Sequence, residues 1–212
     1  MPTKQSSAFH AAEQHLAKAD PSMKALIKAH GSCRLKPQKD YFLVLCDAII
    51  SQQLSVKAAA TIVARFCALF PKEMPTPALV LGMPDDIVRG VGCSGAKVRY
   101  IKDLAANFES KTLKPKQFST LGDEELIELL TQVKGIGRWT AEMFLIFSLN
   151  RLDVMATDDL GLRKGMMKVY GLPDLPKRAQ MLEIAEVWKP YRSIASWYLW
   201  RSLDNEPKKA TS

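Results

Sequence analysis

The residues best suited to chemistry lie in two short segments that each precede an expected helix. The first segment reads KGIGRWT and places Gly135 and Gly137 directly before Arg138 and Trp139. Glycine adopts backbone angles closed to other residues, and it strips side chains from a turn so that N–H groups can approach another molecule. N–H groups at a helix start are unpaired and lie at the positive end of the helix dipole. The segment suits an anion such as a DNA phosphate, or it is an ordinary glycine turn between two helices.

The second segment reads TDDLGLRKG and carries Asp158 and Asp159 at a helix start. Both carboxylates are suited to capping the helix. A carboxylate at this place also stays ionised, because the dipole favours the anion. An ionised carboxylate can stabilise a sugar that becomes positively charged as its base leaves, and it can orient the attacking water. The residues alone leave capping and catalysis open.

The elements that must position these segments are helices. Strand signals are scarce, whereas helical periodicity recurs along the chain and predicts an all-α fold. The segment YFLVLCDAII is apolar on nearly every side, which is typical of a buried central helix. Helices are predicted over residues 8–20, 21–30, 41–50, 55–70, 95–110, 123–133, 138–150, 158–171, 177–188 and 190–203.

Charge narrows the choice of partner. The chain has 212 residues, with 30 Lys and Arg against 22 Asp and Glu, and a formal charge of +8. This excess suits a polyanion, of which nucleic acid is the commonest. A hydrophobic fraction of 47% is enough for a substantial core. The length predicts one domain, or two small lobes that share a cleft.

Several function classes are disfavoured. The N-terminal segment shows no secretory signal, and no run reaches the apolar length of about 20 residues that a membrane span needs. We therefore expect an intracellular protein with no membrane partner. The cysteines have irregular gaps and no histidine at zinc-ligand spacing, which predicts buried thiols rather than disulfides or a zinc site. They are Cys33, Cys46, Cys67 and Cys93.

Taken together, these segments resemble the helix-hairpin-helix DNA glycosylase superfamily. GIGRWTA is especially similar to the 3-methyladenine DNA glycosylase II branch, and AIISQQLSVKAA resembles the segment that carries its DNA wedge. DVMATDDLGLRKG resembles the aspartate loop, and WKPYRSIASWYLWR resembles the final helix. The match runs in the same order from about Tyr41 to Arg201. It implies one glycosylase unit over residues 1–212, with two helical lobes around a cleft.

Within that unit, the resemblance places the wedge segment and the hairpin in about residues 41–150. The N-terminal region and residues 151–205 would complete the second lobe. About 40 residues precede the core match, too few for the extra N-terminal domain of longer bacterial relatives. The sequence is therefore similar to a compact form of the enzyme.

The resemblance assigns roles to the chemical residues. Asp159 matches the catalytic aspartate, which leaves Asp158 as the helix cap. Trp139 stands where lyase-active members carry a Schiff-base lysine, so a monofunctional glycosylase is implied. Its indole suits stacking on a flipped cationic base. Trp200 matches a pocket aromatic, with core packing as the alternative, and Met143 replaces another aromatic, which puts the range of damaged bases in doubt.

The resemblance also assigns the contacts with DNA. Gln53 matches the wedge position, and its apolar neighbour Leu54 is the alternative. The phosphate-binding group comprises Gly135, Gly137, Lys134, Arg138 and Thr140. Backbone carbonyls of Thr131, Val133 and Ile136 match family ligands of a structural monovalent cation, Na⁺ or K⁺.

No further cofactor is implied. No cysteine follows Cys93, which excludes the iron–sulfur cluster of related branches, and whether Cys93 touches DNA or packs is open. The expected protein is a monomer that excises alkylated purines, such as 3-methyladenine, from double-stranded DNA. It would act in the cytoplasm or nucleoid, or in the nucleus of a eukaryote. The alternatives are a glycosylase for uracil or deaminated purines and a non-catalytic lesion-binding protein.

Overall fold

The regular structure of the chain is helical. The computed structural model describes residues 4–204, and within this range it contains twelve α-helices and three short 3-10 helices without a strand. The predicted all-α fold is confirmed. The chain divides into two compact units, one combining Met1–Lys36 with Asn150–Ser212 and the other formed by Pro37–Leu149.

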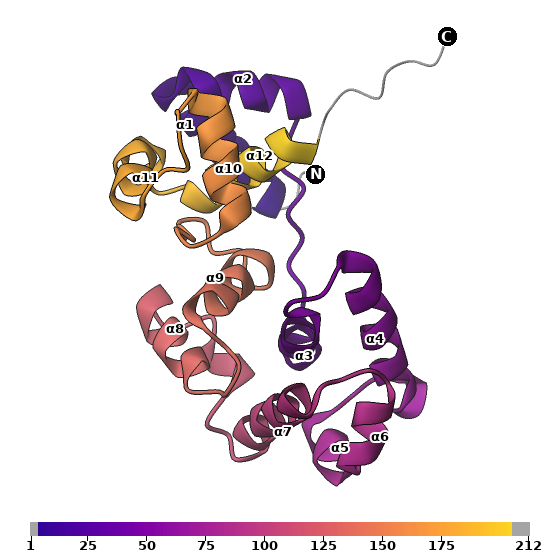
Figure 1. Cartoon of the computed structure of the whole chain (residues 1–212). Helices are drawn as coiled ribbons and strands as arrows, with labels where there is room; N and C mark the ends of the chain where they lie inside the picture. The colour runs from indigo at the N-terminus through magenta and orange to yellow at the C-terminus, as the bar shows by residue number, and fades with distance from the viewer. Residues whose placement is uncertain (1–3, 205–212) are drawn as a thin grey trace. The chain divides into compact units, whose positions relative to one another are not determined.

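The unit formed by Pro37–Leu149 is built around α3, as Figure 1 shows. Helix α3 contacts α4, α7 and α9, and its buried side chains include Phe42, Leu45 and Ile49, as its apolar sequence predicts. The elements of this unit are α3 (Tyr41–Ser51), α4 (Val56–Ala68), η1 (Pro71–Glu73), α5 (Pro77–Gly82), α6 (Asp85–Gly90), α7 (Gly95–Glu109), η2 (Pro115–Gln117), α8 (Asp123–Thr131) and α9 (Arg138–Phe147).

Side-chain caps set the starts of several of these helices. Asp40 accepts a hydrogen bond from the Leu43 N–H, and Ser55 and Ser94 cap α4 and α7 in the same way. Each cap pairs an N–H group that the first helical turn leaves without a partner. The start of each of these three helices is therefore set by local sequence.

The other unit packs α12 against α10, α2 and α1. Gly165 permits the close approach of α10 and α12, because a Cβ at this glycine would lie 2.7 Å from the Leu199 carbonyl oxygen. The elements are α1 (Lys4–Ala19), α2 (Pro21–His30), α10 (Leu160–Tyr170), α11 (Arg178–Ile184), η3 (Ala185–Trp188) and α12 (Arg192–Asp204).

Two buried carboxylates hold this unit together. Glu13 Oε1 accepts hydrogen bonds from the Cys33 N–H at 2.7 Å and the Tyr198 hydroxyl at 3.0 Å. Asp20 Oδ2 accepts from the Tyr170 hydroxyl at 2.6 Å and from an indole N–H. Buried charged oxygens need such donors, so each carboxylate ties together segments that are distant in sequence.

The four cysteines are free thiols. Cys33, Cys46 and Cys93 are buried as predicted, whereas Cys67 is partly exposed, because it lies on the half-exposed side of α4. Burial raises the pKa of the Cys33 thiol to about 12. Across residues 4–204, no cluster of three His, Cys, Asp or Glu residues is placed to hold a metal ion. No helix in that range is both long and apolar enough to span a membrane.

Candidate active site

The turn between α8 and α9, residues 132–137, is here called the hairpin turn. Gly135 has a φ of 86°, a backbone conformation that disfavours other residues. A Cβ at Gly135 would overlap the ring of Tyr100. The predicted need for glycine is confirmed at this position, on both conformational and steric grounds.

Gly137 is the N-cap of α9 and differs from Gly135. Its φ of −91° and ψ of 172° are extended backbone that any residue adopts, so the prediction of a special backbone angle is wrong here. A Cβ at Gly137 would meet no protein atom within 4 Å. The protein's own packing does not require this glycine, and the exposed turn leaves room for another molecule.

The polar groups predicted to bind phosphate differ in their availability. The Lys134 N–H donates to Asp103 Oδ2 at 2.9 Å, while the lysine side chain is 74% exposed. Arg138 donates to both Glu124 oxygens, at 2.6 and 2.9 Å, and to Glu142 at 3.0 Å. The hydrogen bonds to Glu124 raise the pKa of Arg138. Its charge is therefore compensated within the protein, and Lys134 is the cation that the turn presents.

Thr140, the remaining residue of the predicted phosphate-binding group, is buried and faces a pocket instead of the surface of the turn. This pocket has a volume of about 410 Å³. Apolar and polar side chains from α3, the following turn and α9 share its wall. The lining residues are Ala48, Ser51, Gln52, Gln53, Trp139, Thr140 and Met143.

The structure brings together four residues that the sequence analysis singled out, namely Gln53, Trp139, Thr140 and Met143. Trp139 is 45% exposed, which is unusual for a large indole and leaves surface available to a ligand. The sequence analysis did not single out Ala48 or Gln52 as site residues. Nothing in their residue types pointed to the pocket, although both lie next to the predicted wedge.

The turn after α3, residues 52–55, is here called the wedge turn. Gln53 has a φ of 57°, uncommon for a residue with a side chain, and it lies at the pocket. Leu54 is 37% exposed. The Gln52 side chain donates to the Gly135 carbonyl oxygen at 2.7 Å, which joins the wedge turn to the hairpin turn.

The aspartate loop belongs to the other unit. Asp159 is the N-cap of α10, and its Oδ1 accepts the Leu162 N–H at 2.6 Å. The assignment of Asp158 as the cap is wrong, because the helix begins one residue later than that assignment requires and Asp158 points to solvent. The carboxylate of Asp159 therefore caps the helix and is also the candidate for catalysis.

Trp200 lies beside this aspartate. Its Nε1–H donates to Asp159 Oδ1 at 2.8 Å, and its ring lies within 3.4 Å of the place where a Cβ of Gly161 would be. The structure thus connects Trp200 to the aspartate, and its place in a base pocket stays a prediction.

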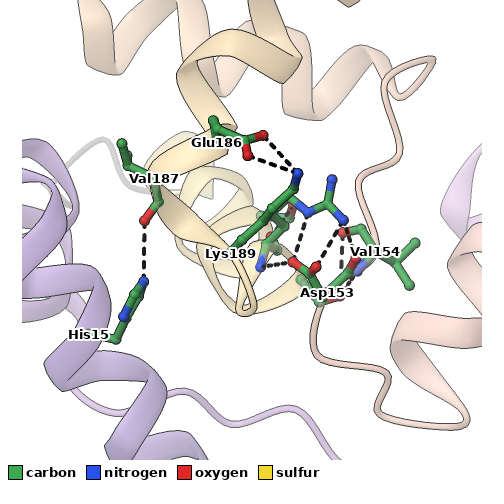
Figure 2. A network of polar contacts seen from close by, with 9 residues as sticks. His15, Asp153, Val154, Glu186, Val187 and Lys189 are labelled. Carbon is green, nitrogen blue, oxygen red and sulfur yellow. Dashed lines mark hydrogen bonds and ion pairs between the residues drawn. The ribbon is translucent and has the colours of Figure 1, made fainter.

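The start of the loop is fastened to the start of α12. Arg192 donates to both carboxylate oxygens of Asp153, at 2.7 and 2.9 Å, and to its carbonyl oxygen at 2.9 Å. The Ser193 hydroxyl accepts the Val154 N–H at 2.9 Å. Figure 2 shows this network around Asp153 and Val154. Bidentate arginine–carboxylate pairs fix orientation well, so the loop before Asp159 is anchored by one helix at both ends.

Comparison with known proteins agrees with these features. Residues 46–190 match the family described as HhH-GPD superfamily base excision DNA repair protein. DNA-3-methyladenine glycosylase 1 of Schizosaccharomyces pombe is 41% identical over 90% of this chain and 86% of its own length. The chain belongs to the HhH-GPD superfamily of base excision DNA repair proteins.

Two solved structures carry the similarity into three dimensions. The S. pombe 3-methyladenine DNA glycosylase Mag1, in complex with abasic DNA, has a TM-score of 0.83 and 39% identity, covering 92% of this chain and 98% of that chain. A DNA-3-methyladenine glycosidase from Bacillus halodurans has a TM-score of 0.80 and 34% identity, covering 89% and 86%. This chain is accordingly a DNA-binding enzyme of the DNA glycosylase type.

Proposed function

We propose that this glycosylase hydrolyses the N-glycosidic bond of alkylated purines, such as 3-methyladenine, in duplex DNA. Support comes from the relatives in S. pombe and B. halodurans, a 3-methyladenine DNA glycosylase and a DNA-3-methyladenine glycosidase, and from the abasic DNA bound to the former. The products would be a free base and an abasic site. These two relatives support most directly the choice of alkylated purines as the lesion.

The observation that carries the proposal is the geometry of Asp159. Its Oδ1 is held by the Leu162 N–H of a helix N-terminus and by the Trp200 indole. A fixed carboxylate can stabilise the positive charge that the sugar gains when the bond to the base breaks. The electron pair of that bond goes to the departing base, and water adds to the sugar carbon and loses a proton.

An alkylated purine lowers the demand for acid catalysis. A purine methylated at N3 or N7 is cationic and becomes neutral when it takes the bonding electron pair. One carboxylate is therefore sufficient, in contrast to the paired carboxylates of most glycoside hydrolases. The exposed face of Trp139 suits a cationic base, an attraction worth up to about 2 kcal/mol in a desolvated site.

We further propose that the enzyme is monofunctional. A β-lyase of this superfamily needs a lysine amine to form an imine with the sugar, and Trp139 occupies that sequence position. None of the seven residues that line the pocket carries an amine. Strand cleavage should therefore require alkali after the base has left.

The DNA contacts follow from the two turns. Gln53, or its neighbour Leu54, would fill the space that the flipped base vacates. The open backbone at Gly137 and the exposed Lys134 would hold phosphate, which positions the protein without reading sequence. The backbone N–H of Gly135 would contribute to the same phosphate site, whereas Arg138 is paired with Glu124 and Glu142 and Thr140 lines the pocket.

A monovalent cation fits the same turn. Thr131 ends α8, so its carbonyl lacks an intrahelical donor, and the Val133 carbonyl accepts one hydrogen bond from the Ile136 N–H at 3.1 Å and keeps a second lone pair. With the Ile136 carbonyl, these oxygens would hold Na⁺ or K⁺ and add positive charge at the phosphate. The chemistry of the aspartate needs no cofactor. We expect a monomer that acts in the cytoplasm or nucleoid, or in the nucleus of a eukaryote.

The test is base release from methylated duplex DNA, with wild type and Asp159→Asn compared side by side. We expect wild type to free 3-methyladenine and leave strands that break only after alkali. Asp159→Asn should lose about 10²-fold to 10³-fold in rate while it still binds DNA. Asp158→Asn is the matched control, because it makes the same change one residue away on an exposed side chain.

Three outcomes would overturn the proposal. Strand breakage without alkali would contradict the monofunctional reading of Trp139. If neither wild type nor Asp159→Asn frees methylated bases but both bind the DNA, the protein is a lesion-binding member of the family. Release of uracil or hypoxanthine from matched duplexes, without release of methylated purines, would assign it to another lesion class.

A further inference from the structure

One face of α7 contacts both DNA-facing turns of the Pro37–Leu149 unit. Lys97, Tyr100 and Asp103 are spaced three residues apart and therefore lie along one side of the helix, over about 9 Å. Lys97 contacts the wedge turn, whereas Tyr100 and Asp103 contact the hairpin turn. These three residues are here called the template face.

The first contact closes the end of α3. Lys97 Nζ donates to the Ile50 carbonyl at 2.7 Å and to the Gln52 carbonyl at 2.8 Å. The last carbonyls of a helix lack intrahelical donors and lie at the negative end of its dipole, where a cation is stabilising. The next residue, Gln53, has the uncommon φ of 57°. The lysine thus holds the backbone at the point where the chain must adopt this conformation.

The second contact holds the hairpin turn against α7. The Tyr100 ring occupies the space that a side chain at position 135 would need. Asp103 Oδ2 accepts the Lys134 N–H at 2.9 Å, and its other oxygen lies 3.8 Å from the Lys134 ammonium. The backbone on either side of the Gly135 nitrogen is therefore fixed against the same helix.

A third contact joins the two turns directly. Gln52 Nε2 donates to the Gly135 carbonyl oxygen at 2.7 Å. The carbonyl oxygen of the same Gln52 accepts a hydrogen bond from the Lys97 ammonium. Lys97, Gln52 and Gly135 thus form a continuous chain of hydrogen bonds between α7 and the hairpin turn. Neither turn can shift along α7 without breaking at least one charged hydrogen bond, which is stronger than a neutral one.

We propose that the template face, together with Gln52, is a positioning device that holds the wedge turn at a fixed spacing from the hairpin turn. The inference rests on the proposed function, in which one turn grips a phosphate while the other fills the gap left by a flipped base. If the spacing is rigid, binding of the phosphate also places Gln53 correctly. This matters because misplacement of a group by about 1 Å is costly. Lys97 acts through the wedge turn and is a positioning residue.

The test compares three lysine variants in base release and in DNA distortion. Lys97→Met removes the ammonium and keeps an apolar stem, and Lys97→Arg restores a charged donor. Lys102→Met is the matched control, because Lys102 lies on the same helix and pairs with the more exposed Asp85. Fluorescence of 2-aminopurine placed beside an abasic site reports insertion of the wedge without any chemistry.

We expect Lys97→Met to lower kcat about 30-fold with KM changed less than about threefold, and to reduce the fluorescence rise. Lys97→Arg should recover most of both signals, and Lys102→Met should stay within about twofold of wild type. In a Gln53→Ala background, Lys97→Met should cost at most about threefold, since coupled residues are not additive.

The opposite results would overturn the inference. An unchanged kcat and fluorescence in folded Lys97→Met, or the same loss with and without Gln53, would make Lys97 a structural contact only. If Lys97→Met fails to fold, Gln52→Met keeps the side-chain length and removes the bond to the Gly135 carbonyl. Loss of the fluorescence rise in that variant supports the device, and a wild-type signal refutes it.

These measurements also distinguish a failure of this inference from a failure of the proposed function. A wild-type protein that brightens 2-aminopurine, loses this signal on Lys97→Met and releases no alkylated purine would refute the substrate proposal and keep the positioning device. A wild-type protein that does neither would refute both.

Discussion

Two helices of the unit that contains α12 begin with an aspartate that also accepts a hydrogen bond from a tryptophan indole N–H. Asp20 caps α2 and accepts the Trp188 Nε1–H at 2.9 Å. Asp159 caps α10 and accepts the Trp200 Nε1–H at 2.8 Å. The same three groups, a helix N-terminus, a carboxylate and an indole, are thus assembled twice in one unit.

Burial separates the two sites. Asp20 is 7% exposed, and both oxygens are used, Oδ1 by the Ser22 and Met23 N–H groups and Oδ2 by Tyr170 and Trp188. Asp159 is only partly buried, so its carboxylate can be reached by a substrate. A saturated, buried carboxylate can only support the fold. The constellation alone does not define a catalytic aspartate, and exposure to a substrate must be added.

The largest expected difference is in stability. Asp20→Asn places an amide NH₂ against groups that are themselves donors, and we expect it to lower the free energy of unfolding by about 2–4 kcal/mol. Asp159→Asn should cost less than about 1 kcal/mol, because asparagine is a good N-cap. Urea unfolding of both variants checks this. Equal losses of stability in the two variants would show that the sites do not differ in the way their burial indicates.

The second expected difference is in the two tryptophans. Trp200→Phe keeps a ring but removes the N–H that orients Asp159, and we expect base release to slow about tenfold with DNA affinity nearly unchanged. Trp188→Phe should leave the rate of folded protein unchanged and lower its melting temperature. Single-turnover rates at saturating protein measure the effect. A loss of rate in Trp188→Phe at full folding would contradict the division of roles.

The buried carboxylates also predict a response to alkaline pH. Burial and then the bond to Asp20 raise the pKa of Tyr170, and burial and then the charge of Glu13 raise that of Tyr198. The fold favours the neutral phenols, so their stabilising contribution is complete below about pH 10, where unfolded tyrosine begins to ionise, and is lost as pH rises. Each phenol should reduce stability by up to about 1.4 kcal/mol per pH unit. Tyr170→Phe should reduce the slope of the free energy of unfolding against pH, measured between pH 10 and 11. A wild-type free energy of unfolding that does not change over this range would refute the cause.

The smallest effect is expected beside the catalytic candidate. Asp158→Ala removes an exposed carboxylate that does not cap α10, and we expect a change in stability within about 0.5 kcal/mol. Its base-release rate should stay within about twofold of wild type, as for other exposed substitutions. A large loss of rate would move the catalytic role, or part of it, from Asp159 to Asp158.

Local sequence predicted much of the fold. The apolar segment that forms α3 and the acidic first turn of α8 are readable from neighbouring residues, because a helix satisfies its hydrogen bonds within itself and displays its buried face at a 3.6-residue period. The positive φ of Gly135 was readable as a property of the turn between two helices, whereas its close contact with Tyr100 was not. At Gly137 the local rule failed, since the extended backbone there has no need of a glycine.

What the sequence by itself determined is the all-α class, the order of the family motifs and the residue types available for chemistry. Only the tertiary structure decided that Arg138 is neutralised by Glu124, that Trp200 holds Asp159 and that Lys97 closes α3. The physical reason is distance along the chain. Trp200 and Asp159 lie 41 residues apart, and Lys97 and Ile50 lie 47 apart. Hydrogen bonds of this range depend on how helices pack, which no local pattern of residues specifies.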